Sequence, residues 1–428
     1  MKTTESLLKT EDREHIWHPF DQMKNANILP IVKGEGTYVF DEDGKKYIDG
    51  FSSWWVNTHG HCNPHIANEI SKQVQLLEHV AFGGFTHPQA VRLAKRLANI
   101  TPKEIQKFFF SDNGSTANEV ALKMAIQYWY NKGEKRNKVI ALKGDYHGDT
   151  FGSMSATNIE NMNTPFEPML FESVFISPPK KETILETLEE LEGHLKKGDT
   201  ACFIYEPLVQ GASGMLMHDP ESLSQILALC KKYKVLTIAD EVFTGFGRTG
   251  KLFASNHIKE QPDIMCLSKG LTGGFMALGI TAVTDEVYNA FYSNDKSKTF
   301  LHGHSYTGNP IACSAANGAL DLFEEEHTWE NIARISALNL QLASKINEHP
   351  LVNEARNLGT IVAIELKTQE ASSYFNEKGK DAYKFFLSKG LLLRPLGNVI
   401  VIVPRYCISD DDLTYIYTTI EDYLNQNN

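Results

Sequence analysis

The chain has 428 residues, of which 42% are hydrophobic and 22% charged, a balance typical of a globular protein large enough for two lobes. A formal net charge of −11, with no lysine- and arginine-rich run, argues against a nucleic-acid-binding protein. No apolar stretch is long enough to span a bilayer, and the first twenty residues lack the apolar core of a signal peptide. We therefore expect a cytoplasmic protein that acts on small molecules.

The N-terminal residues predict a β-hairpin followed by a pair of tryptophans. Two short apolar runs, 38–40 and 47–48, flank an Asp-Gly pair at residues 43–44, which is a common hairpin turn. Trp54 and Trp55 follow. Because neighbouring side chains of an extended segment point to opposite faces, at least one indole is expected to line a cleft or an interface. An aromatic side chain exposed at a lobe boundary is the alternative.

Short apolar runs then alternate with helical segments. Helices are expected after Ser115 and after the Asp219-Pro220 pair, where apolar residues recur at helical spacing. This alternation predicts an α/β fold with a mostly parallel sheet covered on both faces. The apolar runs are residues 107–110, 139–142, 202–205, 235–239, 264–267 and 280–283.

The pattern changes near residue 310 to that of a smaller α+β lobe. A long helical segment over residues 312–326 precedes closely spaced strand-like runs, and a final helix is expected to begin at Ser409. The N-terminal hairpin is expected to join this lobe. We therefore predict an N-terminal segment (1–56), a large domain (57–310) and a C-terminal small domain (311–428).

Polar residues follow several of the apolar runs, at the edge where a parallel sheet binds its ligands. Gly114 and Ser115 open a helix whose free N–H groups would hold a phosphate, although an ordinary helix cap is the alternative. Tyr146 would lie on a planar ligand or occupy a turn. Glu206 and Asp240 each follow a run directly, and Asp240 would hold a protonated ring nitrogen or cap a helix.

Lys269 follows the run at 264–267 and begins a turn that contains Gly270, Gly273 and Gly274. If the ammonium is desolvated there, its pKa falls and the amine becomes a usable nucleophile and base. A lysine that points to solvent is the alternative. Its place one strand after Asp240 fits adjacent strands. A phosphate cradle, a flat aromatic ring, an acid and an amine are the groups that a phosphorylated pyridine aldehyde requires.

Two further motifs carry less weight. Residues 245–250 read GFGRTG and match the dinucleotide fingerprint, but five residues separate them from the strand end and Arg248 and Thr249 suit a shaped loop. The two His-x-His pairs have no nearby acidic ligand that would complete a metal site, and the six scattered cysteines include no Cys-x-x-Cys pair. We predict no metal; a dinucleotide-dependent oxidoreductase and a cofactor-free binding protein stay as alternatives.

Several motifs resemble those of class III aminotransferases of the pyridoxal-phosphate fold type I superfamily. They include DGFSSWW, GDYHGDTFG, ADEVFTGFGRTG, CLSKGLTGG, HGHSYTGNP and RPLGNVI, and the resemblance extends from residue 18 to about residue 400. Within this family the chain is most similar to the branch that aminates 8-amino-7-oxononanoate in biotin synthesis. The resemblance implies a large domain with a mostly parallel seven-stranded sheet, a smaller α+β domain from both termini, and a homodimer with active sites at the subunit interface.

The resemblance also implies a role for each matching residue. Lys269 would bind the aldehyde of pyridoxal 5′-phosphate covalently, Asp240 would pair with the ring nitrogen, and Tyr146 would stack on the ring. Further cofactor contacts would be Gly114, Ser115 and Glu206, with His304 and Ser305 of the partner subunit. The implied substrate contacts are Phe20, Trp54, Trp55, Tyr146, Asp149, Arg248, Lys269, Gly303 and Arg394, of which Arg394 would bind the carboxylate of the oxo acid.

The expected amino donor depends on residue 20. Family members that use S-adenosylmethionine generally carry tyrosine where this chain has Phe20, whereas phenylalanine resembles the lysine-using form. S-adenosylmethionine is the expected donor, and lysine is the alternative for the same acceptor. A different ω-aminotransferase reaction is the other alternative.

Overall fold

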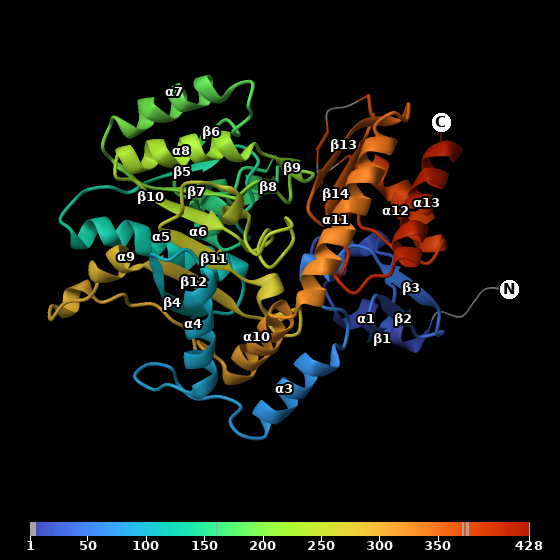
Figure 1. Ribbon diagram of the computed structural model, residues 1–428, viewed down its shortest axis with the longest axis horizontal. Helices are drawn as coiled ribbons and strands as arrows, with labels where there is room; N and C mark the ends of the chain where they lie inside the picture. The colour runs from blue at the N-terminus through green and yellow to red at the C-terminus, as the bar shows by residue number, and fades with distance from the viewer. Residues whose placement is uncertain (1–5, 160, 370–371, 374–375, 428) are drawn as a thin grey trace.

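The computed structural model describes residues 6–159, 161–369, 372–373 and 376–427, which form two lobes (Figure 1). The larger lobe contains a seven-stranded sheet between layers of helices, and the smaller lobe contains both ends of the chain. Among the helices of these described residues, none has the length and apolarity that crossing a membrane requires.

The seven-stranded sheet confirms the predicted α/β fold, and each predicted apolar run is a strand. Strand β12 is antiparallel to both of its neighbours, and the other neighbouring strands are parallel. The edge strand β6 was not predicted, because it is short and three of its four residues are only partly buried. In spatial order the strands are β4 (Ile105–Ser111), β12 (Gly279–Thr284), β11 (Ile264–Leu267), β10 (Leu236–Asp240), β7 (Thr200–Tyr205), β5 (Lys138–Leu142) and β6 (Ser173–Ile176).

Alternating residues of the central strands fill two separate cores, one on each face of the sheet. Met265 and Leu267 of β11 pack in the core that contains residues of α4, α7 and α8, whereas Ile264 and Cys266 pack against α5. Because both faces are covered, these strands are apolar throughout rather than alternating. The helices are α4 (Pro88–Ile100), α5 (Gly114–Asn131), α7 (Ile184–Leu195) and α8 (Pro220–Lys232).

The smaller lobe joins the two ends of the chain through strand pairing. The predicted hairpin forms between β2 (Tyr38–Asp41) and β3 (Lys46–Asp49), and β3 pairs in parallel with β15 (Leu391–Leu392). With β1 (Ile31–Glu35) they form a four-stranded sheet. A second sheet contains β13 (Val352–Leu358), β14 (Ile361–Leu366) and β16 (Val399–Ile402).

The predicted helix over residues 312–326 corresponds to one helix, which ends three residues earlier than predicted. Helix α10 (Pro310–Phe323) ends before the acidic residues 324–326, and α11 (Glu326–Ile346), which the sequence analysis did not predict, begins there. The predicted C-terminal helix is α13 (Asp410–Gln426), capped by Ser409. Other helices are α3 (Pro64–Val74), α6 (Phe151–Ser155), α9 (Asp285–Asn289) and α12 (Lys378–Ser388), and the small hairpin β8 (Val209–Gln210)–β9 (Leu216–Met217) lies beside the large sheet.

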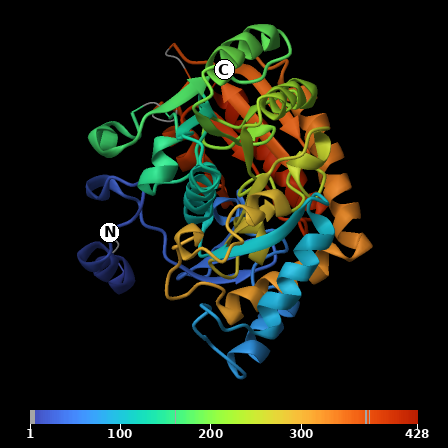
Figure 2. The ribbon, with the colours of Figure 1, turned by 90° about the vertical axis from the view of Figure 1, so that its left-hand side faces the viewer.

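Two further segments, one peripheral and one buried, complete the fold. Helix α1 (Leu7–His15) has no buried residue and lies at the edge of the molecule (Figure 2). Residues 245–250, the GFGRTG motif, form a series of turns in which Gly247 and Gly250 have φ of 91° and 87°. No helix begins at this motif, so it lacks the structure of a dinucleotide fingerprint.

Candidate active site

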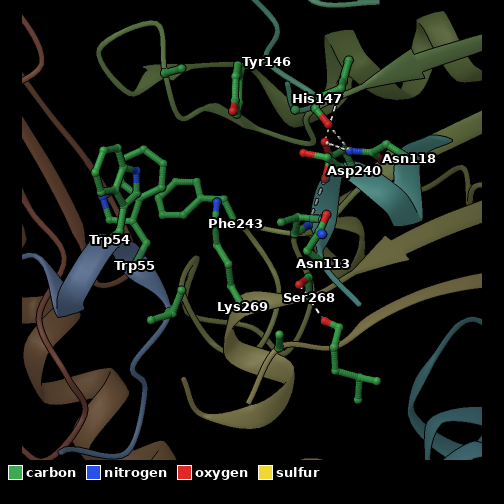
Figure 3. Close-up of a pocket in the computed structure, with 18 of the residues that line it drawn as sticks. Trp54, Trp55, Asn113, Asn118, Tyr146, His147, Asp240, Phe243, Ser268 and Lys269 are labelled. Carbon is green, nitrogen blue, oxygen red and sulfur yellow. Dashed lines mark hydrogen bonds and ion pairs between the residues drawn. The ribbon is translucent and has the colours of Figure 1, made fainter. Parts of the chain in front are cut away.

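A cavity of about 460 Å³ lies at the carboxyl ends of β10 and β11 (Figure 3). Strand β10 pairs with β11 in parallel, as predicted, so the chain segments that carry Asp240 and Lys269 leave the sheet side by side. Residues from the N-terminal segment close the opposite wall. The predicted residues that line the cavity are Phe20, Trp54, Trp55, Gly114, Ser115, Tyr146, Glu206, Asp240 and Lys269.

Lys269 begins the short 3-10 helix η4 (Lys269–Thr272) and directs its amine into the cavity (Figure 3). Its Nζ lies 4.8 Å from the centre of the Trp55 ring and 5.5 Å from that of Phe243. Burial lowers the pKa of Lys269 to about 8, although the carboxyl groups of Asp240 and Glu206 act in the opposite direction. A substantial fraction of the amine is therefore neutral near pH 8, as a nucleophile and base requires.

Asp240 is buried and held by three donors. Its Oδ2 accepts hydrogen bonds from Asn118 Nδ2 at 2.7 Å and from His147 Nδ1 at 2.8 Å, and its Oδ1 accepts one from the N–H of Val242 at 3.1 Å. Burial alone would lower the pKa of His147, but Asp145 and Asp240 on either side raise it to about 10. The imidazole is therefore a cation that orients the carboxylate of Asp240. His147 and Asn118 were not predicted as site residues, because nothing in their spacing shows that they meet Asp240.

The N-terminus of α5 forms another wall of the cavity. Asn113 caps it by accepting the N–H of Thr116 at 2.9 Å, and residues 112–115 line the cavity. A Cβ on Gly114 would lie 2.6 Å from Val242 Cγ1, and one on Gly148, which has φ of 125°, would lie 2.0 Å from Ser115 Oγ. Only residues without a side chain fit at these two positions, so backbone N–H groups border the cavity, as a phosphate site requires.

We expect Gly114→Ala to lower the free energy of unfolding by about 1–3 kcal/mol, because the added methyl group must displace Val242. Gly193→Ala is a matched control: its Cβ meets nothing within 4 Å inside α7, and alanine should raise the stability by up to about 1 kcal/mol. Urea unfolding followed by circular dichroism measures both. Equal stability of Gly114→Ala and the wild type would contradict the tight fit at Val242.

Glu206 fixes the loop that carries Tyr146. The Glu206 carboxyl group accepts the N–H of Tyr146 and the N–H of Gly211, both at 2.9 Å. Burial, with the nearby Asp145, raises the pKa of Glu206 to about 8. The side chain of Tyr146 points into the space above Lys269 (Figure 3). Glu206 thus acts on the site mainly through the backbone of Tyr146.

Trp54 and Trp55 both line the cavity, because their segment is not extended as the sequence analysis assumed. Residues 52–55 form a turn, labelled α2 (Ser52–Trp55), in which four successive non-glycine residues have φ of 53°, 47°, 67° and 69°. This left-handed conformation costs about 1–2 kcal/mol per residue. Phe20 lies 5.3 Å from Trp54, ring centre to ring centre, and the Arg394 guanidinium lies 4.3 Å from the same indole.

Arg248, a predicted substrate contact, is not among the residues that line the cavity. The side chain is only 1% exposed and donates hydrogen bonds to three backbone carbonyls, those of Pro404 at 2.8 Å, Trp55 at 3.1 Å and Asn57 at 3.0 Å. Two of its guanidinium nitrogens are therefore engaged behind the tryptophan turn, and its contact with substrate stays a prediction. The sequence alone did not separate this role from ligand binding.

The other predicted residues lie outside the cavity of their own chain. Asp149 is exposed, and its backbone N–H donates to Ser115 Oγ at 3.3 Å. Gly303 and Ser305 are exposed and His304 is partly buried, on the segment that precedes α10. Their roles toward a partner subunit stay predictions. Arg394 is not among the lining residues either, and its guanidinium lies 4.3 Å from the centre of the Trp54 ring.

Comparison with known proteins places this geometry in a family. Residues 20–424 match the family Aminotransferase class-III. An adenosylmethionine-8-amino-7-oxononanoate aminotransferase from Synechococcus elongatus is 44% identical, over 96% of this chain and 99% of that protein. The crystal structure of the enzyme of the same name from Methanocaldococcus jannaschii has a TM-score of 0.93 and 38% identity, covering 98% of this chain and 99% of that one. An amine transaminase from an uncultivated Pseudomonas species, solved in its pyridoxal-phosphate-bound form, has a TM-score of 0.90 and 29% identity, covering 96% and 98%.

The strand order and the position of the lysine after β11 define an α/β protein with the fold of type I pyridoxal-phosphate-dependent transferases. The chain belongs to the class III aminotransferase family and is an aminotransferase.

Proposed function

We propose that this enzyme transfers an amino group to 8-amino-7-oxononanoate, giving 7,8-diaminononanoate for biotin synthesis, with pyridoxal 5′-phosphate as its cofactor. The observation that carries the proposal is the placement of Lys269, with its lowered pKa, in one cavity with the buried carboxylate of Asp240. The names of the Synechococcus and Methanocaldococcus relatives support this acceptor.

The residues of the cavity fit the cofactor at each of its polar groups. The N–H groups at Gly114 and Ser115 suit the phosphate, Asp240 suits the ring nitrogen, Tyr146 suits a face of the ring, and the Lys269 amine suits the aldehyde. When bound, pyridoxal phosphate supplies an electron-withdrawing ring that stabilises negative charge next to the transferred nitrogen.

The protein groups then have separate tasks in the reaction. In its neutral form Lys269 Nζ accepts the proton from the α-carbon of the donor and returns a proton in the second half of the cycle. The imidazole of His147 holds the carboxylate of Asp240 in place through a hydrogen bond of 2.8 Å. Trp55 and Phe243, which pack at 4.6 Å between ring centres, exclude water from one side of the lysine.

Arg394 is the side chain best suited to bind the acceptor carboxylate. Its guanidinium lies 4.3 Å from the centre of the Trp54 ring, and Trp54 lines the cavity. A guanidinium can bind a carboxylate through two parallel hydrogen bonds. The oxo acid would thus extend from Lys269 along the tryptophans to Arg394.

We expect Arg394→Met to raise KM for 8-amino-7-oxononanoate by about 10- to 100-fold, since one charge-assisted hydrogen-bonding group is lost. Arg92→Met, which removes an exposed arginine paired with Asp321 on the surface, is the matched control and should leave KM unchanged. Initial rates over a range of acceptor concentrations measure both. An unaltered KM for Arg394→Met would favour a different ω-aminotransferase reaction.

The donor is expected to be S-adenosylmethionine, as in the names of the relatives, with lysine as the alternative. Phe20 lines the cavity beside Trp54 and offers no hydroxyl group there. The test is to incubate cofactor-loaded enzyme with 8-amino-7-oxononanoate and one donor at a time, and to measure 7,8-diaminononanoate by mass spectrometry. If neither donor gives 7,8-diaminononanoate at any concentration, the proposed function is refuted.

The proposal extends to a homodimer with shared sites. His304 and Ser305 do not reach the cavity of their own chain, and large apolar side chains beside them, Leu301 and Tyr306, are 85% and 68% exposed. A second copy would cover these side chains and receive His304 and Ser305 in its phosphate site.

The pairing of β3 with β15 supports the proposed division into residues 1–56, 57–310 and 311–428. Four buried free cysteines fit the reducing cytoplasm that we propose as its location.

A further inference from the structure

A buried ion pair lies directly behind the left-handed turn of Trp54 and Trp55, outside the cavity. Arg405 is fully buried and Asp49 is 1% exposed. The guanidinium of Arg405 donates to the backbone carbonyl of Asp49 at 2.8 Å and to its carboxylate, and the ring of His61 contacts both side chains. Neither Asp49 nor Arg405 lines the cavity, so neither has a direct role in ligand binding.

Asp49 uses its carboxylate to hold the beginning of the turn. Its Oδ1 accepts the N–H groups of Phe51 at 3.3 Å and Ser53 at 3.2 Å, and its Oδ2 accepts the hydroxyl of Ser53 at 2.6 Å. The hydroxyl of Ser52 donates to the carbonyl of Val403 at 2.6 Å. These hydrogen bonds hold the backbone N–H groups of Phe51 and Ser53 in place. In a segment without such contacts, the same groups would point in other directions.

The end of the turn is held by a second arginine. Arg248 donates to the carbonyls of Trp55 and Asn57, and also to that of Pro404 next to Arg405. The turn is therefore tied at both ends to residues 403–405, which lie about 350 positions later in the chain. Four successive L-residues rarely adopt positive φ without such external contacts.

We propose that Arg405 and Asp49 are positioning residues for the acceptor side of the active site, acting through the left-handed turn on both indoles. If the turn relaxed toward an extended segment, adjacent side chains would diverge, and only one tryptophan would face the cavity. Either the contact of Trp54 with Arg394 or that of Trp55 with Lys269 would then be lost. The consequence for the oxo acid rests on the proposed function, whereas the conformation of the turn does not.

The test uses Arg405→Met, which removes the charge but keeps much of the volume, and Arg405→Lys, which keeps the charge but not the two-armed geometry. We expect faster amide hydrogen exchange in peptides covering residues 50–57 for both variants, measured by mass spectrometry on cofactor-loaded protein. We also expect KM for the oxo acid to rise about 10- to 100-fold in Arg405→Met, with a much smaller change in kcat. Arg405→Lys should give an intermediate KM for the oxo acid. It also provides the test if Arg405→Met does not fold.

A pair of double variants separates positioning from general destabilisation. Glycine adopts positive φ without penalty, so Arg405→Met/Ser53→Gly should recover part of the lost acceptor affinity, about threefold or more. Arg405→Met/Ser53→Ala removes the same hydroxyl but keeps a Cβ, and it should recover nothing. A merely structural role of Arg405 would make the two double variants equal.

The outcomes distinguish the inference from the proposed function. Unchanged exchange at residues 50–57 in folded Arg405 variants would overturn the inference, as would equal behaviour of the glycine and alanine double variants. If the wild type fails to aminate the oxo acid, the proposed function fails, but the exchange measurement still decides whether Arg405 and Asp49 hold the turn. Faster exchange with unaltered KM would also overturn the inference, because the turn would then not set acceptor binding.

Discussion

Lys269→Ala is expected to reduce amino transfer by at least about 10²- to 10⁴-fold, the usual contribution of a positioned proton-transfer group. The side chain supplies both the amine for the cofactor aldehyde and the base for the donor proton, and no other lysine lines the cavity among the described residues. Single-turnover rates with the donor alone measure the loss. Lys259→Ala, which removes an exposed lysine, should retain full activity.

A second readout for Lys269 does not depend on turnover. Borohydride fixes an aldehyde irreversibly to an amine, so treatment of the cofactor-loaded wild type should add the mass of the reduced cofactor to the peptide that carries Lys269. The Lys269→Ala protein should still hold the cofactor through the Gly114–Ser115 end of the cavity but should not be labelled. An active Lys269→Ala variant, or labelling of another lysine, would contradict the assignment.

Asp240→Asn is expected to lower kcat by about 10²- to 10³-fold, the range seen when one preorganised electrostatic partner is removed. An amide cannot stabilise a protonated ring nitrogen as a carboxylate does, and it would leave the cationic His147 with Asp145 as its remaining acidic neighbour. Steady-state rates at saturating donor and acceptor measure the change. Asp219→Asn, which alters only the cap of α8, is the matched control and should leave kcat unaffected.

Asp240 also has a spectroscopic readout, because the charge at the ring nitrogen changes the visible absorption of pyridoxal phosphate. The Asp240→Asn protein should bind the cofactor with a shifted absorption maximum, whereas Asp219→Asn should match the wild type. Identical spectra and rates for Asp240→Asn and the wild type would show that the carboxylate does not face the ring.

The Asp49–Arg405 pair shows how a costly backbone conformation is maintained at a functional site. Each buried charge is paired and hydrogen-bonded, which offsets the cost of removing it from water. The pair stabilises a turn whose residues disfavour that conformation. The turn then orients two large aromatic side chains. Specificity for the acceptor would thus depend on residues that never touch it.

The amino-acid sequence by itself determined the large sheet and the chemistry at its edge. An apolar run followed directly by Asp240, and another followed by Ser268 and Lys269, are local signals. The burial of a strand and the polar residues at its end are both encoded within a few positions. The Gly-Ser pair at the start of α5 is equally local. The short edge strand β6 and helix α11 were missed because their local patterns are weak or interrupted by charge.

Only the tertiary structure decided the contacts between distant segments. His147 and Asn118 meet Asp240 from 93 and 122 positions away, and Arg405 meets Asp49 from 356 positions away. The three backbone carbonyls that Arg248 contacts likewise leave no mark in the sequence around it. The left-handed turn at Trp54 and Trp55 follows the same rule: its residues favour other conformations, and hydrogen bonds from residues far along the chain impose this one.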